Sequence, residues 1–215
     1  MPRPPFLAIS TAMFSGIVET TSKLLKVEEG QQVYRIFLQK PAEFDDLKIG
    51  DSVAVNGVCL TVEMFDAEKM QFSLGHETLR VLQWKKDDWQ NRPVNVERSL
   101  KLSDRIHGHL VTGHVETLGQ IQRSEKVGEN WFLNVKVPRT LLPYIWKKGS
   151  VTLHGVSLTV NELQDDVLEV CLIPETQKRT NLTLFKTADF IHLEADYMAK
   201  AFHRFYELQG HHDKI

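Results

Sequence analysis

The sequence contains a thiol and a hydroxyl at matching places in a pattern that occurs twice. Gly57–Val62 reads Gly-Val-Cys-Leu-Thr-Val, and Gly155–Val160, 98 residues later, reads Gly-Val-Ser-Leu-Thr-Val. Side chains alternate between the two faces of a strand, so Cys59 shares a face with the threonine two positions on, and Ser157 does the same. A thiol or hydroxyl beside a threonine can hydrogen-bond a planar polar ring or act as a weak nucleophile.

A structural interpretation of these residues stays open on the pattern alone. Thr61 and Thr159, with the thiol and hydroxyl beside them, are small enough to be interior residues that fill the taper of a small barrel. The other cysteine, Cys171, lies 112 residues from Cys59 and so falls outside the repeat offset. We therefore expect Cys171 to be a core cysteine.

Three histidines form a second group of chemically capable residues. His107, His109 and His114 have the arrangement H-x-H-x4-H, which superficially resembles a metal site. The intervening Gly108 and Gly113 favour a turn, and no cysteine or acidic residue joins at a recognised ligand spacing, so we expect no metal. An imidazole titrates near neutrality, which suits one of these histidines to carry protons in a binding pocket.

Composition narrows the classes of function. Lys and Arg number 26 and Asp and Glu 28, giving a formal charge of −2, so we expect neither nucleic acid nor an anionic membrane as a partner. No apolar run approaches the roughly 20 residues of a membrane span. Two cysteines cannot frame a disulfide scaffold, which favours a reducing, cytoplasmic setting. Phosphate-binding glycine loops and the motifs of standard hydrolases and zinc proteases are absent from the sequence.

Three further landmarks repeat in the same order as the Cys and Ser patterns. The offset between the copies is 97 or 98 residues in every case. The landmarks are Gly16–Glu19 with Gly113–Glu116, Glu77-Thr78 with Glu175-Thr176, and Val94–Glu97 with Ile191–Glu194. A period this long indicates duplicated domains rather than a solenoid, whose units span about 20–50 residues.

Each copy has the alternating pattern of β-strands. Val53 and Val55 alternate before Asn56-Gly57, and alternating apolar residues resume at Val58. Asn-Gly is a strong signal for a tight hairpin turn, because both residues tolerate positive φ, and His154-Gly155 takes the same place in the second copy. Further expected strands are Val33–Gln39, Gln71–Leu74, Pro93–Glu97, Trp131–Val137, Val167–Ile173 and Phe190–Ala195. The predicted fold is all-β, with two tandem homologous small closed, Greek-key-like β-barrels plus a C-terminal α-helix.

The predicted organisation has five parts. They are a flexible lead-in (1–12), barrel 1 (13–108), barrel 2 (109–195), a helix (196–209) and a polar tail (210–215). Asp196 is the expected N-cap of the helix. The helix carries one apolar face, formed by Met198, Ala201, Phe202, Phe205 and Leu208. Such a face must be covered, either by the protein's own barrel or by a neighbouring subunit.

Taken together, the landmarks resemble the riboflavin synthase family over residues 13–208. In the first repeat the resemblance rests on Met13–Glu19, Gly50–Val62, Glu77–Arg80 and Val94–Arg98. In the second repeat it rests on Gly108–Val115, Lys148–Ser150, Gly155–Thr159 and Leu172–Thr176. Both repeats carry their motifs in order, so the resemblance is specific and covers both barrels.

The resemblance implies a transferase that uses no cofactor. Two molecules of 6,7-dimethyl-8-ribityllumazine bind per active site, and one passes a four-carbon unit to the other. The products are riboflavin and 5-amino-6-ribitylamino-pyrimidinedione. The resemblance also implies a cytoplasmic homotrimer, in which the C-terminal helices associate and barrel 1 of one subunit faces barrel 2 of the next, and it suggests lumazine synthase as a further partner. Two like substrates held in contact need two like pockets, which gives the duplication a chemical reason.

The resemblance further implies which residues form the two substrate-binding sites. The first site would use Phe14, Gly16, Ile17, Val18, Cys59, Leu60, Thr61, Ser73, Leu74, Gly75, His76, Glu77 and Thr78. The second would use Gly113, His114, Val115, Ser157, Leu158, Thr159, Ile173, Pro174, Glu175, Thr176, Gln177 and Lys178. Lys148 would reach the ligand of an adjacent subunit. As catalytic residues we expect Cys59 and Ser157 near the ring carbons, with His114 and Thr159 as proton carriers.

Two departures from the family pattern bear on the chemistry. The family commonly has an aspartate where this chain has His154, and Gly-Gly-His in place of Ile106–His109. If that aspartate positions the serine, His154 must take over its role. The alternative function is a non-catalytic, lumazine- or flavin-binding antenna protein, which would keep one site and lose the other. The signatures around both Cys59 and Ser157 are present, which favours the enzyme.

Overall fold

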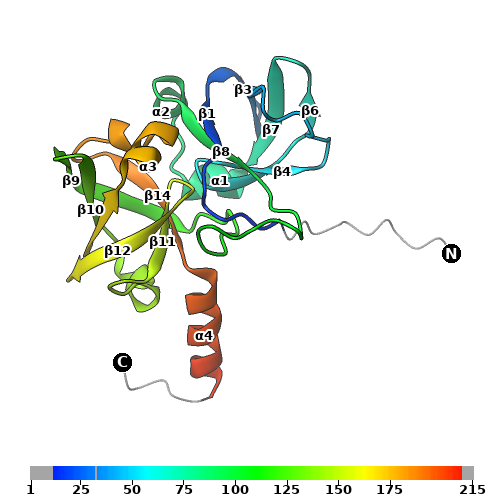
Figure 1. Ribbon diagram of the computed structural model, residues 1–215. Helices are drawn as coiled ribbons and strands as arrows, with labels where there is room; N and C mark the ends of the chain where they lie inside the picture. The colour runs from blue at the N-terminus through cyan, green and yellow to red at the C-terminus, as the bar shows by residue number, and fades with distance from the viewer. Residues whose placement is uncertain (1–11, 32, 210–215) are drawn as a thin grey trace.

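A computed structural model describes residues 12–31 and 33–209 of the chain. It contains two β-rich halves side by side and a C-terminal helix that extends away from both (Figure 1). In these ranges we find no helix with the length and apolarity that a membrane span requires. The expected tail, and all but the last residue of the expected lead-in, lie outside the described residues.

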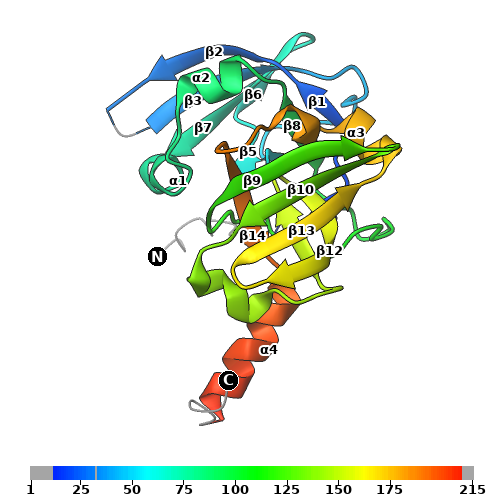
Figure 2. The ribbon, with the colours of Figure 1, turned by 90° about the vertical axis from the view of Figure 1, so that its left-hand side faces the viewer.

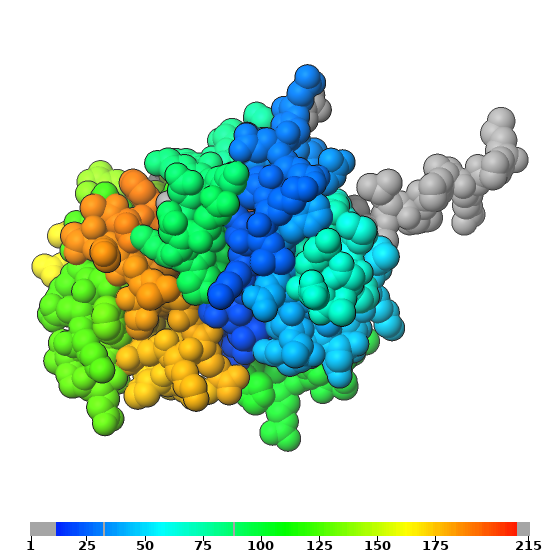
Figure 3. All heavy atoms as spheres, turned by 90° about the horizontal axis from the view of Figure 1, so that it is seen from above, coloured from blue at the N-terminus to red at the C-terminus, as the bar shows by residue number. Residues whose placement is uncertain are grey.

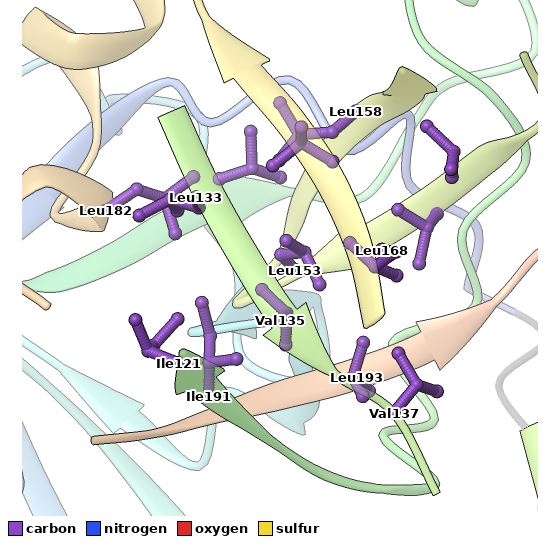
Figure 4. Close-up of a cluster of buried hydrophobic side chains, with 14 of the residues drawn as sticks. Ile121, Leu133, Val135, Val137, Leu153, Leu158, Leu168, Leu182, Ile191 and Leu193 are labelled. Atoms are coloured by element: carbon purple, nitrogen blue, oxygen red, sulfur yellow. The ribbon is translucent and has the colours of Figure 1, made fainter. Parts of the chain in front are cut away.

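The second half is a closed barrel of six antiparallel strands (Figure 2). The order around the barrel is β10-β13-β12-β11-β14-β9. The strands are β9 Thr117–Val127, β10 Asn130–Lys136, β11 Ser150–Leu153, β12 Val156–Gln164, β13 Val167–Leu172 and β14 Phe190–Ala195. Alternate residues point inward, and aliphatic side chains such as Leu133, Leu153 and Leu168 fill the interior (Figure 4).

The first half has the same ring of strands, with two of them broken. Its strands are β1 Thr20–Ser22, β2 Leu24–Glu29, β3 Val33–Gln39, β4 Ser52–Val55, β5 Val58–Thr61, β6 Met64–Phe65, β7 Lys69–Gly75 and β8 Val94–Arg98. They form two four-stranded sheets, β1-β8-β4-β5 and β2-β3-β7-β6. Only Lys23 separates β1 from β2, and only Val62 and Glu63 separate β5 from β6. Each pair therefore corresponds to one continuous strand of the second half, β9 or β12.

Short helices connect the strands at equivalent places in the two halves. Helix α1, His76–Val81, directly follows β7, and α3, Pro174–Arg179, follows β13 after a single residue, Ile173. The remaining connecting segments are α2, Lys86–Gln90, and the 3-10 turns η1, Arg139–Tyr144, and η2, Leu182–Leu184. The predicted duplication is thus confirmed in helices as well as in strands.

The two halves meet back to back at a pair of hairpin turns. Asn56-Gly57 and His154-Gly155 have φ values of 48°, 84°, 52° and 85°, as the predicted turn requires. A Cβ on Gly57 would lie 2.6 Å from the backbone N of Gly155, and one on Gly155 would lie 2.7 Å from that of Gly57. Only glycine fits at either position, so this close approach fixes how the barrels pack.

The C-terminal helix α4, Tyr197–Leu208, begins at the expected N-cap. The Asp196 carboxylate accepts hydrogen bonds from the N–H of Met198 at 2.7 Å and of Ala199 at 3.3 Å. The predicted apolar face of the helix is exposed in the single chain: Phe202 is 68% exposed and Phe205 61%. The protein's own second barrel therefore leaves this face uncovered.

Candidate functional site

Cys59 and Ser157 lie on the outer surface of their barrels, just after the turns at the interface. The next residues, Leu60 and Leu158, point into the two barrel cores. Cys59 and Ser157 are half-buried, and the threonine two positions after each is exposed. This alternation confirms the expected orientation and rules out the interpretation of these residues as barrel filling.

The glycine loop of each half packs against the other half. The backbone N–H of Ser157 donates to the Gly16 carbonyl at 2.7 Å, and that of Cys59 donates to the Gly113 carbonyl at 2.8 Å. A Cβ on Gly16 would lie 2.7 Å from the Cβ of Ser157, and one on Gly113 would lie 2.7 Å from the Cβ of Cys59. Val18 accordingly belongs to the core of the second barrel.

The predicted grouping of these loops is therefore wrong. We expected Gly16–Val18 to join Cys59 and Gly113–Val115 to join Ser157, following their order in the chain. The structure exchanges the two loops, because the segments before them cross at a bridge between Phe14 and Val111, whose backbones are hydrogen-bonded at 2.8 and 3.0 Å. Each site is thus built from both halves.

A buried carboxylate holds each exchanged loop. Glu97 Oε1 accepts hydrogen bonds from the N–H of Ser15 at 2.7 Å and from its hydroxyl at 2.9 Å. Glu194 Oε1 accepts from the N–H and the hydroxyl of Thr112, both at 2.7 Å, and its Oε2 accepts from the N–H of Gly113 at 3.1 Å. Burial raises the pKa of Glu97 to about 7 and also raises that of Glu194. The sequence marked both residues only as repeat landmarks.

Ser157 is hydrogen-bonded to His109, which is not among the predicted site residues. Its Oγ lies 2.7 Å from Nδ1 of His109, and Nε2 of His109 lies 3.2 Å from Oγ1 of the buried Thr152. Burial lowers the pKa of His109, while the carboxylate of Asp196 acts in the opposite direction. In the tautomer whose Nε2 donates to Thr152, Nδ1 accepts from Ser157, and the ring can act as a base toward the serine hydroxyl.

The first half lacks this hydrogen-bonded array. Ala54 lies opposite Cys59, whereas Thr152 lies opposite Ser157. Ala12 is the equivalent of His109 and, like Cys59, packs against the buried cluster that contains Phe14. Burial raises the pKa of the Cys59 thiol, with a smaller opposing effect from a hydrogen bond to Ser52. The thiol therefore stays protonated at neutral pH and is a hydrogen-bond donor rather than a thiolate nucleophile.

The other two histidines with predicted roles lie elsewhere. His154 is buried, with its ring 4.3 Å from that of His192 and 4.9 Å from that of Phe185. The side-chain partner of the serine is His109, so His154 is not the residue that positions the serine hydroxyl. His114 is exposed and follows Gly113, which places it beside Cys59 rather than beside Ser157.

Cys171 is not a core residue, contrary to our expectation. It is half-buried on the outer face of β13, while Val170 and Leu172 on either side of it point into the core. The pair Val160–Val170 sets the register of β12 with β13 and places Cys171 next to Thr159. Cys171 is the equivalent of Ser73 on β7, because the two residues are 98 positions apart. The distance of 112 residues between Cys171 and Cys59 in the sequence does not show this equivalence.

The remaining predicted residues surround the two outer faces. Phe14 is fully buried beneath Cys59, and the side chain of Leu74 points into the first core, so neither offers side-chain surface to a ligand. Lys148 is exposed at the turn before β11. The helices α1 and α3 carry His76, Glu77, Thr78, Pro174, Glu175, Thr176, Gln177 and Lys178 at the rims of the barrels, with Ser73, Gly75 and Ile173 just before them.

Metal-ligating residues do not gather in the part of the chain that the structure describes. Within residues 12–31 and 33–209 no three His, Cys, Asp or Glu side chains come close enough to hold an ion. The two outer faces offer hydroxyl, thiol, imidazole and backbone groups, which can bind a planar polar ring and move protons to and from it.

Comparison with known proteins shows that both halves belong to one family. The family model of the lumazine binding domain matches residues 15–99 and again residues 112–196. The riboflavin synthase of Escherichia coli (strain K12) is 39% identical over 197 residues, which cover 88% of this chain and 89% of that protein. The riboflavin synthases of Actinobacillus pleuropneumoniae and Bacillus subtilis (strain 168) are 33% and 31% identical, each over 90% of this chain and 89% of theirs. The chain belongs to the riboflavin synthase family.

Solved structures of a related fold agree with the duplicated barrels. A LumP structure complexed with riboflavin matches with a TM-score of 0.78 at 18% identity, covering 85% of this chain and 98% of that one. A LumP structure complexed with 6,7-dimethyl-8-(1'-D-ribityl) lumazine matches with a TM-score of 0.75, also at 18% identity and over the same shares of the two chains. At this identity the likeness concerns the fold.

The family match includes both halves of the site but omits His109. Cys59 and Glu97 fall inside the first matched range, and Ser157 and Glu194 fall inside the second. His109 lies between the two ranges, in the connection that carries it to the second barrel. The H-x-H-x4-H group could have indicated His109 if its histidines had been assigned to separate loops rather than to one metal cluster.

Proposed function

We propose that this chain is a riboflavin synthase. It transfers a four-carbon unit between two molecules of 6,7-dimethyl-8-ribityllumazine and releases riboflavin and 5-amino-6-ribitylamino-pyrimidinedione. The observation that carries the proposal is the pair of equivalent outer-face sites at Cys59 and Ser157, each completed by a glycine loop from the other half. Two near-identical sites suit a reaction between two copies of one compound.

The two sites differ in chemistry, and this difference supports a division of labour. Beside Ser157, the neutral imidazole of His109 can take a proton from the serine hydroxyl or from a ring methyl and return it later. Beside Cys59 the thiol donates hydrogen bonds, and the exposed His114 and Thr61 can exchange protons with the ring or with water. Thr159 has the equivalent place to Thr61 in the second site.

The complete active site requires more than one subunit in this proposal. The Cys59 and Ser157 sites lie on separate barrels of one chain, and in our proposal two bound rings meet where the first barrel of one copy faces the second barrel of another. The exposed apolar face of α4 supports a homotrimer held by its helices, with Lys148 reaching a neighbour's ligand. Free thiols at Cys59 and Cys171 are consistent with a cytoplasmic enzyme. Lumazine synthase as a partner stays a prediction.

An antenna-type, ligand-binding protein is the alternative function, and the fold likeness to LumP favours its consideration. Purified full-length protein should convert 6,7-dimethyl-8-ribityllumazine to riboflavin, seen as growing riboflavin fluorescence. Ligand that binds at one per chain and stays unconverted would overturn the enzyme and support the antenna protein.

The subunit proposal has its own test. Sedimentation equilibrium of the full chain should give three copies, and a chain ending at Asp196 should sediment as a monomer with little activity. A truncated chain that stays fully active would show that α4 does not help to build the site.

A further inference from the structure

A cavity of about 250 Å³ lies between the two halves, beside the hairpin turns. Its floor is buried and includes His154, His192, Trp89 and Phe185. Its rim is exposed and includes Gln83, Lys85 and Phe190. Seen from above, the segment around α2 lies against the segment that leads into β14, where the two halves meet (Figure 3). The cavity is separate from Cys59 and Ser157, neither of which lines it.

The cavity breaks the internal symmetry of the molecule. Asn56 and Asn95 of the first half are the equivalents of His154 and His192 of the second. Asn181 lies against both asparagines and is hydrogen-bonded to each of them. Its backbone N–H donates to Asn95 Oδ1 at 2.8 Å, and its Nδ2 donates to Asn56 Oδ1 at 3.1 Å and to the Pro93 carbonyl at 2.8 Å. The side-chain amide of Asn181 thus occupies one side of the pseudo-two-fold axis that relates the two halves.

No asparagine occupies the equivalent place on the other side. The residues 97 and 98 positions before Asn181 are Trp84 and Gln83, and the Gln83 side chain is exposed at the rim. The two imidazoles of His154 and His192 therefore border an open space where symmetry would place a side-chain amide. The cavity lies at the place equivalent to that of the Asn181 amide, which no side-chain amide fills among the described residues of the first half.

Polar groups at the cavity have unused hydrogen-bonding capacity. Nε1 of Trp84 and Oδ1 of Asn181 are buried without a hydrogen-bond partner among the described residues, and both residues line the cavity. Burial lowers the pKa of His192 to about 4 and holds that of His154 well below its usual value, so both rings are neutral at pH 7. Of the charged residues that line the cavity, Arg92 and Asp189 pair with each other at 2.7 Å, and Lys85 lies at the exposed rim.

We infer that this cavity binds a planar nitrogen heteroaromatic of one or two rings that carries a lactam edge, an N–H beside a C=O. A lactam N–H is a donor like the N–H groups by which Asn181 binds Asn56 and Asn95 on the opposite side of the axis. Its C=O can accept from the indole N–H of Trp84, which has no partner among the described residues. The rings of Trp89 and Phe185 suit a flat ligand, and Arg92 stacks on Phe185 with its guanidinium 4.8 Å from the ring centre. The volume is below the roughly 300 Å³ at which sites for drug-sized ligands begin, which limits the ligand to a small heterocycle.

Hypoxanthine is a suitable probe, because it is neutral, bicyclic and carries a lactam. The chain has four tryptophans, so a 1H–15N spectrum of the full-length protein resolves binding by site. The indole N–H signals of Trp84 and Trp89 should shift saturably with a Kd below about 1 mM. The signals of Trp131 and Trp146, which do not line the cavity, should stay in place.

A matched pair of variants separates binding in the cavity from binding elsewhere. Trp84→Phe keeps a flat ring but removes the indole N–H, and should raise the Kd at least about fivefold. Trp131→Phe, whose indole N–H donates to Ser124 in the second barrel, should leave the Kd unchanged. Absence of shifts at Trp84 and Trp89 at millimolar hypoxanthine, or equal effects of the two variants, would overturn the inference. The wild-type spectrum decides even if Trp84→Phe does not fold.

Discussion

Nδ1 of His109 lies 2.7 Å from Oγ of Ser157, while the equivalent positions of the first half hold Ala12 and Cys59. The duplicated barrels therefore carry unequal chemistry at matching places. A neutral, half-buried imidazole is hydrogen-bonded to the serine on one side, and a protonated thiol lies at the equivalent place on the other. The five predictions below follow from this asymmetry and from the way the halves pack.

His109→Asn should slow riboflavin formation by about 100-fold, because the serine loses its proton acceptor. His107→Asn is the matched control, since His107 is exposed two residues away and should leave the rate near that of the wild type. Steady-state kinetics with a thermal melt of each variant separates catalysis from folding. Equal rates for the two variants would remove His109 from the chemistry.

Thr152→Val should lower the rate about tenfold through His109, because the hydroxyl that orients the ring is lost while the shape is kept. Thr152→Ser restores an Oγ and should recover most of the rate. The 15N spectrum of the His109 imidazole should show mixed tautomers in the valine variant and one tautomer in the other two proteins. A single tautomer in all three would contradict this role.

Cys59→Ala should slow turnover more than tenfold without loss of stability, because the half-buried thiol lies on the outer face that we propose receives the ring and is a hydrogen-bond donor there. Cys59→Ser supplies the residue that the second half has at Ser157 and should retain more activity. Single-turnover measurements at saturating substrate report the chemical step directly. Wild-type rates in the alanine variant would show that the thiol does not take part.

Stability at acid pH should depend on His192. Its pKa falls from 6.5 to about 4 on burial, so the unfolded chain binds a proton in this window that the folded chain does not, and stability falls as the pH drops from 6.5 to 4. Glu97 acts in the opposite direction: its pKa is raised from 4.5 to about 7, so its contribution is lost as the pH rises through that range.

His192→Asn introduces the residue that the first half has at Asn95. It removes the pH dependence that comes from His192 and keeps the one that comes from Glu97. The free energy of unfolding of the variant minus that of the wild type should be larger at pH 4.5 than at pH 7, by at most about 3 kcal/mol. Urea titrations at both pH values measure the difference, with His107→Asn as an exposed control. Parallel pH dependences of wild type and variant would refute the assignment.

Gly57→Ala should destabilise the protein far more than Gly50→Ala. Both glycines have positive φ, 84° and 93°, so each substitution costs roughly 1–2 kcal/mol of backbone strain. A Cβ at Gly50 meets open space, whereas one at Gly57 would lie 2.6 Å from the backbone of Gly155 and would separate the halves. Chemical denaturation of both variants gives the comparison, and equal losses would show that the close approach is relaxed at little cost.

Local patterns in the sequence were sufficient for much of the fold. The sequence pattern predicted β3, Val33–Gln39, and β14, Phe190–Ala195, with the bounds observed. The turn at Asn56-Gly57 and the N-cap at Asp196 follow from the intrinsic preferences of those residues, and both were confirmed. Strands β1, β2 and β9 were not predicted, because their polar outer faces, exposed on a barrel wall, weaken the alternation.

Other features depend on contacts between residues far apart in the chain. Two barrels with one offset can exchange their glycine loops without any change in local pattern, so only the fold shows that Gly16 meets Ser157 and Gly113 meets Cys59. The hydrogen bond from His109 to Ser157 joins residues 48 positions apart. The position of Cys171 beside Thr159 and the cavity under His154 arise in the same way. By itself the sequence determined most of the strands, the turns and the duplication, because these depend on local patterns of residues. Only the tertiary structure decided which groups meet, because backbone crossing and packing across the pseudo-two-fold axis are set by the whole chain.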